Sequence, residues 1–303
     1  MTDNSVTPET DQKQPRSSPR LVVVGDIMVD VDVHCRAERI CQEGPWPVLS
    51  QQKITSRMGG AGNVLEMLFA LDCKAILCGL VGQDDYKSIP ASGSMTGWQM
   101  TPGRTTTKTR FWVDGKLTGP RWDADNTTKS NQQTADAWRR IIATFRPDAV
   151  IVADHGKGAV SREVMLMLGG LGVPVFLDPV KSTPNPDGKY PTAIIGHSHE
   201  MPCWNWARCG CVVTKRGANG LQWVNSEQTG SLPSQCRSLV DPLGAGDQFI
   251  AALAYQRCMG AEWAGAIRWA NIAAGMQCER VGCVPVTVQD VHQRVNQGRP
   301  AAE

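Results

Sequence analysis

Short continuous runs of apolar residues, separated by segments with helical spacing, constrain the fold of this chain more than any other feature. Six such runs lie at 21–24, 74–82, 148–154, 173–179, 193–196 and 211–217. Helical patterns separate several of them, at 61–72, 132–145 and 161–172. Strands that are apolar throughout and alternate with helices are typical of a mostly parallel sheet with helices on both faces. The sequence therefore predicts an α/β fold.

The composition of the 303 residues fits a globular protein. Hydrophobic residues make up 41% of the chain and charged residues 20%, and the formal net charge of +2 is too small to indicate a nucleic-acid partner. No apolar run approaches the roughly 18 residues of a membrane span. The eleven cysteines follow no secretory signal, so we expect reduced thiols in a cytoplasmic protein. Residues 1–19 are polar, and we expect a disordered tail there.

Two segments alternate between polar and apolar residues instead of running apolar, at 31–57 and 105–125. They predict exposed antiparallel strands, in a small sheet beside the main one. The dipeptide Asp114-Gly115 predicts a hairpin turn in the second segment.

The stretch DPLGAGDQF at 241–249 places three small residues, Gly244, Ala245 and Gly246, directly before an acid. Apolar residues follow with the spacing of one helix face, so the small residues form a turn at a helix N-terminus. Free N–H groups and the positive end of the dipole suit an anion there, and small residues let a phosphate approach. Asp247 would repel a phosphate, but it can accept the proton of a hydroxyl that attacks one. A turn with Asp247 as helix cap is the alternative.

Several motifs, in family order, resemble those of the pfkB (ribokinase-like) carbohydrate kinases. The stretch at 241–249 resembles their D-T-x-G-A-G-D signature, with Pro242 where threonine is usual, and MGGAGN at 58–63 resembles their G-G-x-x-N segment. The kinase half of the ADP-heptose synthesis enzymes is more similar still, over the segments VVVGDIMVD, RICQEGPWPV, TTTKTR, ADHGKGAV and LDPVK. The resemblance covers about 21–290.

The resemblance implies a Rossmann-like ribokinase fold in a single kinase domain over 20–300, with a small β lid. The two polar segments, 31–57 and 105–125, would form this lid. Asp247 would be the general base, with Gly244, Ala245 and Gly246 as the anion hole. The residues implied to hold sugar hydroxyls are Asp30, Gly59, Gly60 and Asn63. Tight helix–sheet packing is the alternative for the glycine pair.

Charged residues near these motifs fit a sugar that already carries a phosphate. The lid holds Lys108, Arg110 and Arg121, and planar or compact cations of this kind bind phosphate. Solvated strand charges are the alternative. Asp154 and Lys157 follow a buried strand, where open α/β sheets bind ligands, although an ordinary turn could also place them there.

The resemblance also assigns the nucleotide and the metal. TKRGANG at 214–220 resembles the nucleotide loop of the family, which implies that Lys215, Gly217 and Gly220 bind ATP, and Asn271 resembles a residue beside the adenine. The N-x-x-E motif that organises Mg²⁺ has its counterpart in HSHE at 197–200, which retains Glu200 but replaces the asparagine by histidine. Mg²⁺ prefers oxygen ligands, so Glu200 is the predicted metal residue.

Two regions depart from the family pattern. The segments 83–104 and 201–210 lack a clear covering helix, which would expose the sheet unless a partner subunit covers it. Zinc-ligand residue types also gather near the second region. They are His197, His199, Cys203, Cys209 and Cys211. Their spacing is not that of a zinc finger, and packing explains them as well.

The sequence therefore predicts an ATP- and Mg²⁺-dependent sugar kinase, with O1 of D-glycero-β-D-manno-heptose 7-phosphate as the acceptor. Two alternatives stay open. One is a catalytically weak relative that binds a sugar phosphate or a nucleotide as a sensor or scaffold, and the other is a kinase for another sugar or a nucleoside. By analogy we expect a homodimer through the lid, and no nucleic-acid or membrane partner. Some bifunctional members carry an added nucleotidyltransferase domain, for which we expect no room in this chain.

Overall fold

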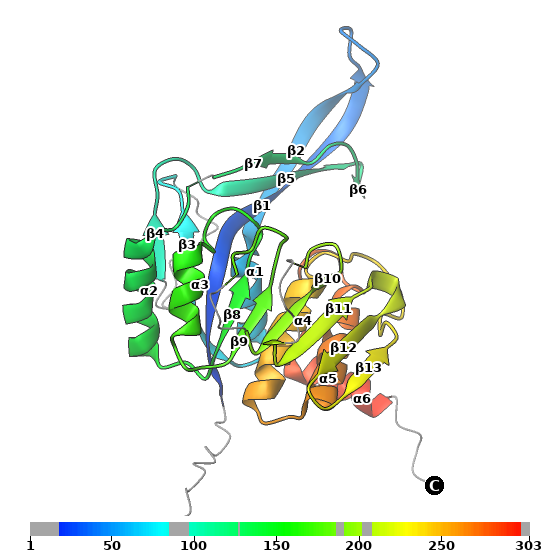
Figure 1. Ribbon diagram of the computed structural model, residues 1–303. Helices are drawn as coiled ribbons and strands as arrows, with labels where there is room; N and C mark the ends of the chain where they lie inside the picture. The colour runs from blue at the N-terminus through cyan, green and yellow to red at the C-terminus, as the bar shows by residue number, and fades with distance from the viewer. Residues whose placement is uncertain (1–17, 85–96, 127, 186–190, 202–207, 298–303) are drawn as a thin grey trace, which may run out of the picture.

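The computed structural model describes residues 18–84, 97–126, 128–185, 191–201 and 208–297 (Figure 1). Nearly all of the expected disordered tail lies outside these residues, as does the greater part of 83–104 and 201–210. Within the described ranges, no helix combines the length and the apolar character that crossing a membrane requires.

Six buried strands form the parallel centre of the sheet and confirm the six predicted strands. They are β1 (Arg20–Ile40), β3 (Lys74–Val81), β8 (Ala149–Ala153), β9 (Val175–Asp178), β10 (Ala193–His197) and β11 (Cys211–Lys215). Three strands that the sequence analysis did not identify extend the edges. They are β4 (Gly97–Met100), β12 (Leu221–Asn225) and β13 (Thr229–Leu232). The order is β13-β12-β11-β10-β9-β8-β1-β3-β4, an open sheet that does not close into a barrel.

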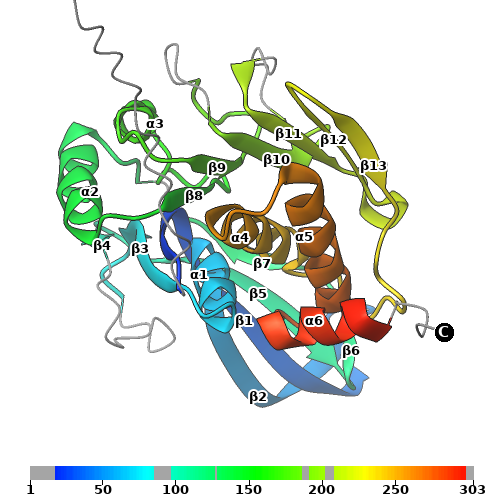
Figure 2. The same ribbon diagram turned by 90° about the horizontal axis from the view of Figure 1, so that it is seen from below.

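Helices cover both faces of this sheet (Figure 2). One face packs against α1 (Ala61–Ala70), α4 (Ala245–Cys258), α5 (Trp263–Gln277) and α6 (Val288–Gln297). The other face packs against α2 (Gln132–Phe145) and α3 (Arg162–Gly169). The first four helices along the chain were predicted, whereas α5 and α6 were not identified. The predicted α/β fold with helices on both faces is confirmed.

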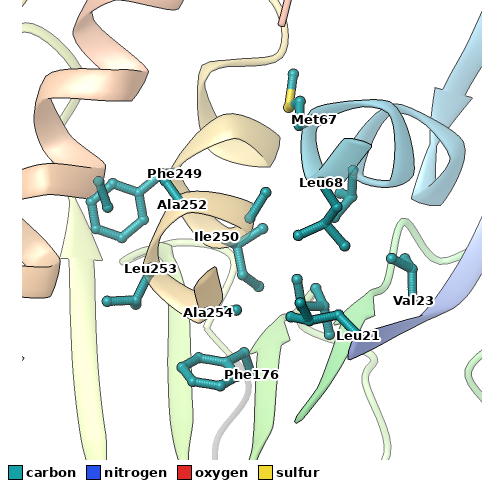
Figure 3. Packing of buried hydrophobic residues seen from close by; sticks show 14 of the residues in the cluster. Leu21, Val23, Met67, Leu68, Phe176, Phe249, Ile250, Ala252, Leu253 and Ala254 are labelled. Carbon is teal, nitrogen blue, oxygen red and sulfur yellow. The ribbon is translucent and has the colours of Figure 1, made fainter. Parts of the chain in front are cut away.

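Burial of apolar side chains sets the position of α4. Ile250 points from this helix toward Leu68 of α1 and Leu21 of β1, whereas Phe249 and Leu253 point to the other side of the helix (Figure 3), and all five belong to one buried cluster. All five side chains are at most 3% exposed. Burying such a side chain contributes about 1.5–3 kcal/mol, so the helix is held firmly against the sheet. Its N-terminus is therefore fixed relative to the ends of the strands.

The lid strands continue directly from the central sheet (Figure 1). The outer half of β1 pairs with β2 (Pro47–Gly60) in antiparallel and with β5 (Thr106–Val113) in parallel orientation. Two short strands, β6 (Lys116–Leu117) and β7 (Trp122–Ala124), pair antiparallel with β5. The prediction of antiparallel lid strands is confirmed for β1 with β2 and for β5 with β6 and β7, but β5 runs parallel to β1. The lid also shares β1 with the main sheet, because β1 is long enough to serve both layers.

The predicted hairpin turn at Asp114-Gly115 is confirmed. Val113 pairs with Lys116 across it, which leaves a two-residue loop. Asp114 has φ 49° and Gly115 has φ 78°. Two positive φ values are what a type I′ hairpin turn requires, and Asp-Gly adopts them readily.

Candidate active site

The carboxyl ends of three parallel strands bring charged residues to one edge of the sheet. Asp154 directly follows β8, Asp178 ends β9 and Lys215 ends β11. The start of α4 lies at the same edge, because a Cβ built on Gly246 would be 3.1 Å from Lys215 Nζ and 3.9 Å from Asp178 Oδ2. The edge therefore combines a helix N-terminus, a cation and two carboxylates.

Asp247 lies in the first turn of α4 and is half-buried. Gly244 occupies the N-cap position with φ 79°, and no side chain caps the helix, so the helix-cap alternative for Asp247 is wrong. Asp247 Oδ2 instead accepts a hydrogen bond of 2.6 Å from Asn63 Nδ2 in the first turn of α1. The contact joins two of the predicted site motifs across 184 residues of sequence.

Burial raises the pKa of Asp247 above the ordinary aspartate value. His155, the hydrogen bond from Asn63 and Lys215 act in the opposite direction, whereas the negative charge of Asp178 adds to the increase. A carboxylate that binds a proton more readily than usual is a better general base near neutral pH. The environment of Asp247 therefore suits proton abstraction.

Close contacts and a positive φ require glycine at position 244. A Cβ on Gly244 would lie 2.8 Å from Cys283 Sγ and 3.1 Å from Asn63 Nδ2, and the positive φ of Gly244 disfavours any side chain. Lys215 Nζ, beside Gly246, lies 3.2 Å from both carboxylate oxygens of Asp178. A lysine next to the positive end of a helix dipole favours an anion between them. Cys283 and Asp178 had not been identified as site residues.

Asp30 occupies a second charged cluster, where the lid joins the sheet. Arg110 Nη1 donates a 2.9 Å hydrogen bond to Asp30 Oδ1, and the two side chains are only 11% and 9% exposed. A Cβ on Gly59 would lie 2.7 Å from Asp30 Oδ2, so glycine leaves room for this carboxylate. Gly60 has φ 58°, and a Cβ there would lie 2.4 Å from the main-chain oxygen of Asp26. The packing alternative therefore fits Gly60, whereas Gly59 borders Asp30.

The lid cations differ in their surroundings. Burial lowers the pKa of Lys108, which pairs in register with Asp30 on β1. Arg57, which had not been identified, donates a 2.9 Å hydrogen bond to Asp32. Three cations, Lys108, Arg110 and Arg57, thus face two carboxylates, an excess of one positive charge.

The third predicted lid cation has a different environment. Arg121 makes two 2.8 Å hydrogen bonds to Asp123 and is 55% exposed. The solvated-charge alternative therefore fits Arg121.

The turn after β8 is held by Asp26, whose role had not been identified. Its carboxylate accepts hydrogen bonds from the main-chain N–H groups of His155 at 2.8 Å, Lys157 at 3.0 Å and Ala159 at 2.8 Å. An acid directly after a buried apolar run was the available signal in the sequence.

The two predicted residues of this turn have protein partners. Asp154 accepts hydrogen bonds from Gly156 N at 2.8 Å and Thr183 Oγ1 at 2.6 Å, and burial raises its pKa to about 6. Lys157 Nζ lies 2.7 Å from Asp125 Oδ2. Both residues stay candidates for binding substrate, but their present contacts also organise the turn.

The predicted nucleotide residues lie on two parts of the structure. Gly217 and Gly220 have φ 57° and 78° in the loop between β11 and β12, and a Cβ on Gly220 would lie 2.0 Å from the main-chain oxygen of Leu232. Asn271 on α5 donates a 2.8 Å hydrogen bond to the main-chain oxygen of Pro233. Asn271 also lines a cavity of about 500 Å³ between α5, α6 and the segment after β13. Pockets of this size commonly bind small molecules.

Glu200 lies three residues beyond β10, and its Oε2 accepts a 3.0 Å hydrogen bond from the main-chain N–H of His197. His197 is in register with Lys215 on β11, so Glu200 lies near the same sheet edge. Mg²⁺ binds one or two carboxylates together with substrate phosphates, and the oxygen ligands of Glu200 and Asp178 fit that chemistry.

The residues of zinc-ligand types do not form a metal site in the described part of the chain. No group of three or more His, Cys, Asp or Glu residues there could hold a metal ion. Cys211 is buried in the core, His197 stacks on His199 with ring centroids 5.5 Å apart, and Cys203 lies outside the described residues. All ten cysteines in the described ranges are free.

Comparison with known sequences agrees with the motifs. Residues 208–289 match the family described as pfkB family carbohydrate kinase. The chain is 29% identical to the "Bifunctional protein HldE" of Granulibacter bethesdensis over 93% of this chain and 66% of the relative, and 28% identical to that of Coxiella burnetii over 92% and 64%. This chain therefore spans slightly less than two thirds of the length of these curated relatives.

Solved structures with the same architecture include several ribokinases and a nucleoside kinase. The Thermotoga maritima ribokinase matches 92% of this chain and 99% of its own with a TM-score of 0.66 and 15% identity. The Arabidopsis thaliana ribokinase was solved in complex with ribose and ATP. It matches 91% of this chain and 98% of its own, with a TM-score of 0.64 and 17% identity. The microbiome-derived acarbose kinase Mak1 matches 91% of this chain and 99% of its own, with a TM-score of 0.70 and 17% identity. The predicted ribokinase fold is confirmed, and together with the sequence matches these findings support a phosphotransferase that acts on a sugar hydroxyl.

Proposed function

We propose that this chain, a pfkB-type carbohydrate kinase with the ribokinase fold, transfers the γ-phosphate of ATP to O1 of D-glycero-β-D-manno-heptose 7-phosphate. The hydrogen bond between Asn63 and Asp247 at the start of α4 is the observation that carries the kinase chemistry. It holds a proton-accepting carboxylate beside a helix N-terminus that suits a phosphoryl group.

In the proposed reaction, Asp247 accepts the proton of the acceptor hydroxyl while the hydroxyl oxygen attacks the γ-phosphorus. The bond from that phosphorus to the leaving oxygen of ADP breaks as the new bond forms. The N–H groups at the start of α4 and the ammonium group of Lys215 stabilise the negative charge on the transferring group. Asp178 orients Lys215 through the 3.2 Å contacts.

Magnesium belongs to the same proposal. When bound, Mg²⁺ neutralises charge on the nucleotide phosphates, and Glu200 together with Asp178 would hold it. The nucleotide residues proposed from the family pattern are Lys215, Gly217, Gly220 and Asn271. The cavity beside Asn271 supports the last of these assignments.

The excess of positive charge near Asp30 supports an acceptor that carries a phosphate. Arg57, Lys108 and Arg110 outnumber the carboxylates of Asp30 and Asp32 by one charge, and these cations are buried or half-buried. Cations with limited access to water bind a phosphate more strongly than exposed ones. The heptose itself is proposed from the similarity of motifs in the lid and at the strand ends.

A coupled assay with ATP and heptose 7-phosphate tests the proposal, with ribose, a hexose phosphate and a nucleoside as competing acceptors. Asp247→Asn should lower turnover by about a thousandfold while ligand affinity is retained, because general-base catalysis contributes roughly 10²–10⁴-fold. Asp136→Asn makes the same chemical change on the surface of α2 and serves as the control. Wild-type activity should also fall on acidification at a higher pH than an ordinary aspartate would give, since the pKa of Asp247 is raised.

The remaining alternatives give different results in this assay. If wild type and Asp247→Asn bind the sugar phosphate equally but neither transfers phosphate, the chain is a sensor or scaffold. If only unphosphorylated acceptors react, the acceptor assignment is wrong while the kinase assignment stands.

A homodimer through the lid also stays a proposal. Apolar side chains are exposed on the lid strands and on the turn between β1 and β2, among them Ile40 at 67%, Trp46 at 53% and Trp122 at 66%. Exposed apolar surface of this kind is common at protein interfaces. Sedimentation of wild type and of Trp122→Ser tests this surface, and a wild-type monomer at micromolar concentration contradicts it. A cytoplasmic location, supported by the free cysteines of the described ranges, belongs to the same proposal.

A further inference from the structure

One carboxylate in the lid joins side chains from two flanking strands. Asp32 lies on β1, between β2 and β5, and its side chain is 10% exposed. Its Oδ1 accepts a 2.9 Å hydrogen bond from Trp112 Nε1 on β5, and its Oδ2 accepts a 2.9 Å hydrogen bond from Arg57 Nη1 on β2. A carboxylate with little access to water requires such partners, because an unpaired buried charge is costly. The two contacts also fix the plane of the carboxylate, so that Oδ2 is directed at Arg57.

The indole of Trp112 is itself held in place. Its ring stacks on that of His34, with ring centroids 6.0 Å apart and an interplanar angle of 19°. The two residues are in register on β5 and β1, two positions beyond the pair formed by Arg110 and Asp32. A side chain that is fixed by packing can hold a second residue in a defined geometry. Trp112 is therefore placed to orient Arg57 through Asp32.

Arg57 extends from the lid toward the segment that borders the start of α4. A Cβ built on Gly282, between α5 and α6, would lie 3.7 Å from Arg57 Nη1. The next residue, Cys283, borders Gly244 at the start of α4. The Arg57 side chain is 31% exposed, and a guanidinium carries five N–H donors, of which the contact with Asp32 uses one. Donors therefore remain for an anion at the boundary between the lid and α4.

We propose that Asp32 and Trp112 are positioning residues, which hold the guanidinium of Arg57 in the orientation that binds the phosphate of the acceptor sugar. A guanidinium that is already fixed loses less rotamer freedom when an anion binds, so the anion is bound more tightly. This inference rests on the proposed function, and it adds two residues that do not touch the sugar. In the structural alternative, these contacts only fasten β5, β1 and β2 to one another.

Steady-state kinetics of Trp112→Phe with ATP and heptose 7-phosphate test the proposal. Phenylalanine keeps an aromatic ring beside His34 but removes the N–H group, so both oxygens of Asp32 can turn to Arg57 and compete with the phosphate. The KM for heptose 7-phosphate should rise roughly tenfold, whereas kcat and the KM for ATP should stay within about twofold. The heptose without its phosphate, measured as a competitor, should keep its inhibition constant within about twofold, because it does not contact Arg57.

A control and a double variant separate positioning from fastening. Trp122→Phe makes the same change at a lid tryptophan that is 66% exposed, and it should leave all of these constants near wild type. In the presence of Arg57→Met, Trp112→Phe should raise the KM for heptose 7-phosphate by less than about twofold further. The residue on which Trp112 acts is then absent, and two substitutions that act through one contact are not additive.

Three results would overturn the assignment. They are an unchanged KM for heptose 7-phosphate in Trp112→Phe, an equal increase in the inhibition constant of the unphosphorylated heptose, and additive effects in the double variant. Failure of the proposed function would look different. Wild type would then transfer no phosphate to any acceptor, or it would react only with unphosphorylated sugars.

Discussion

The sheet edge around Asp247 and the lid around Asp30 both gather charged residues, but they hold them in different ways. At the sheet edge each charge is placed by a close contact with a rigid element, as with Asn63 and Asp247 or with Lys215 beside Gly246. In the lid the charges pair across strands, as Arg110 does with Asp30. The edge thus combines packing contacts with one ion pair, that of Lys215 with Asp178, whereas the lid charges are held by ion pairs between strands.

We infer from this difference that the sheet edge and the lid have different roles. Packing of α4 and α1 against the sheet fixes the atoms that would perform phosphoryl transfer in the proposed reaction, and such atoms tolerate little displacement. Ion pairs between strands can exchange partners with a charged ligand at moderate cost. Under the proposed function, the sheet edge would carry the chemistry and the lid would recognise the acceptor, and four variants test this division.

The largest effect is expected from Arg110→Met in the lid. Removing one partner of a buried ion pair costs about 3–5 kcal/mol, and Lys108 near Asp30 should keep the loss at the lower end. Urea unfolding should therefore show about 3 kcal/mol less stability, and the KM for a phosphorylated acceptor should rise. A variant that is as stable as wild type would show that this lid pair is not buried in solution.

The second largest effect concerns Asp154 and pH. Its folded-state pKa of about 6 lies above the ordinary value of 3.8, so the folded protein binds the extra proton between these values. Stability from this group is present at low pH and is lost as pH rises through 6, by about 3 kcal/mol in total. In Asp154→Asn, stability measured from pH 4 to pH 7 should lack this decrease. Parallel pH profiles for the two proteins would contradict the raised pKa.

Gly244→Ala tests whether packing at the sheet edge controls the chemistry. The new methyl group would meet Cys283 Sγ and Asn63 Nδ2, and the backbone would be strained at φ 79°. Displacing Asn63 and the start of α4 should lower kcat by about a hundredfold, as a misplacement of about 1 Å can do. The double variant Gly244→Ala with Cys283→Ala should recover part of this loss. If kcat were unchanged in the single variant, packing at the sheet edge would not control the chemistry, and the proposed difference between the edge and the lid would be wrong.

The smallest effect is expected from Arg121→Met, the matched control for Arg110→Met. Arg121 is also paired with an aspartate, but it is exposed, and exposed pairs contribute about 0–1 kcal/mol. Stability and the KM for the sugar phosphate should both stay near wild type. A large increase in that KM would show that Arg121 leaves Asp123 and joins the acceptor site.

Local patterns in the sequence predicted the framework around the site. Apolar runs predicted the six strands at the parallel centre of the sheet, and the spacing after Asp247 predicted α4, because burial on a strand or helix face imposes a regular period. The Asp114-Gly115 turn was predicted for a similar reason, since its φ values favour those residues. Helix α5, which is rich in small residues, was not identified from the sequence.

The contacts within the site were decided only by the tertiary structure. Asn63 and Asp247 were each predicted from family motifs, but their hydrogen bond, the pairing of Lys215 with Asp178 and the parallel pairing of β5 with β1 could not be derived from the sequence alone. These contacts join segments far apart in the chain, and no local period specifies which side chains meet. The sequence determined which elements form and where their charged ends lie, and the packing of α4 and α1 on one sheet determined which of those ends come into contact.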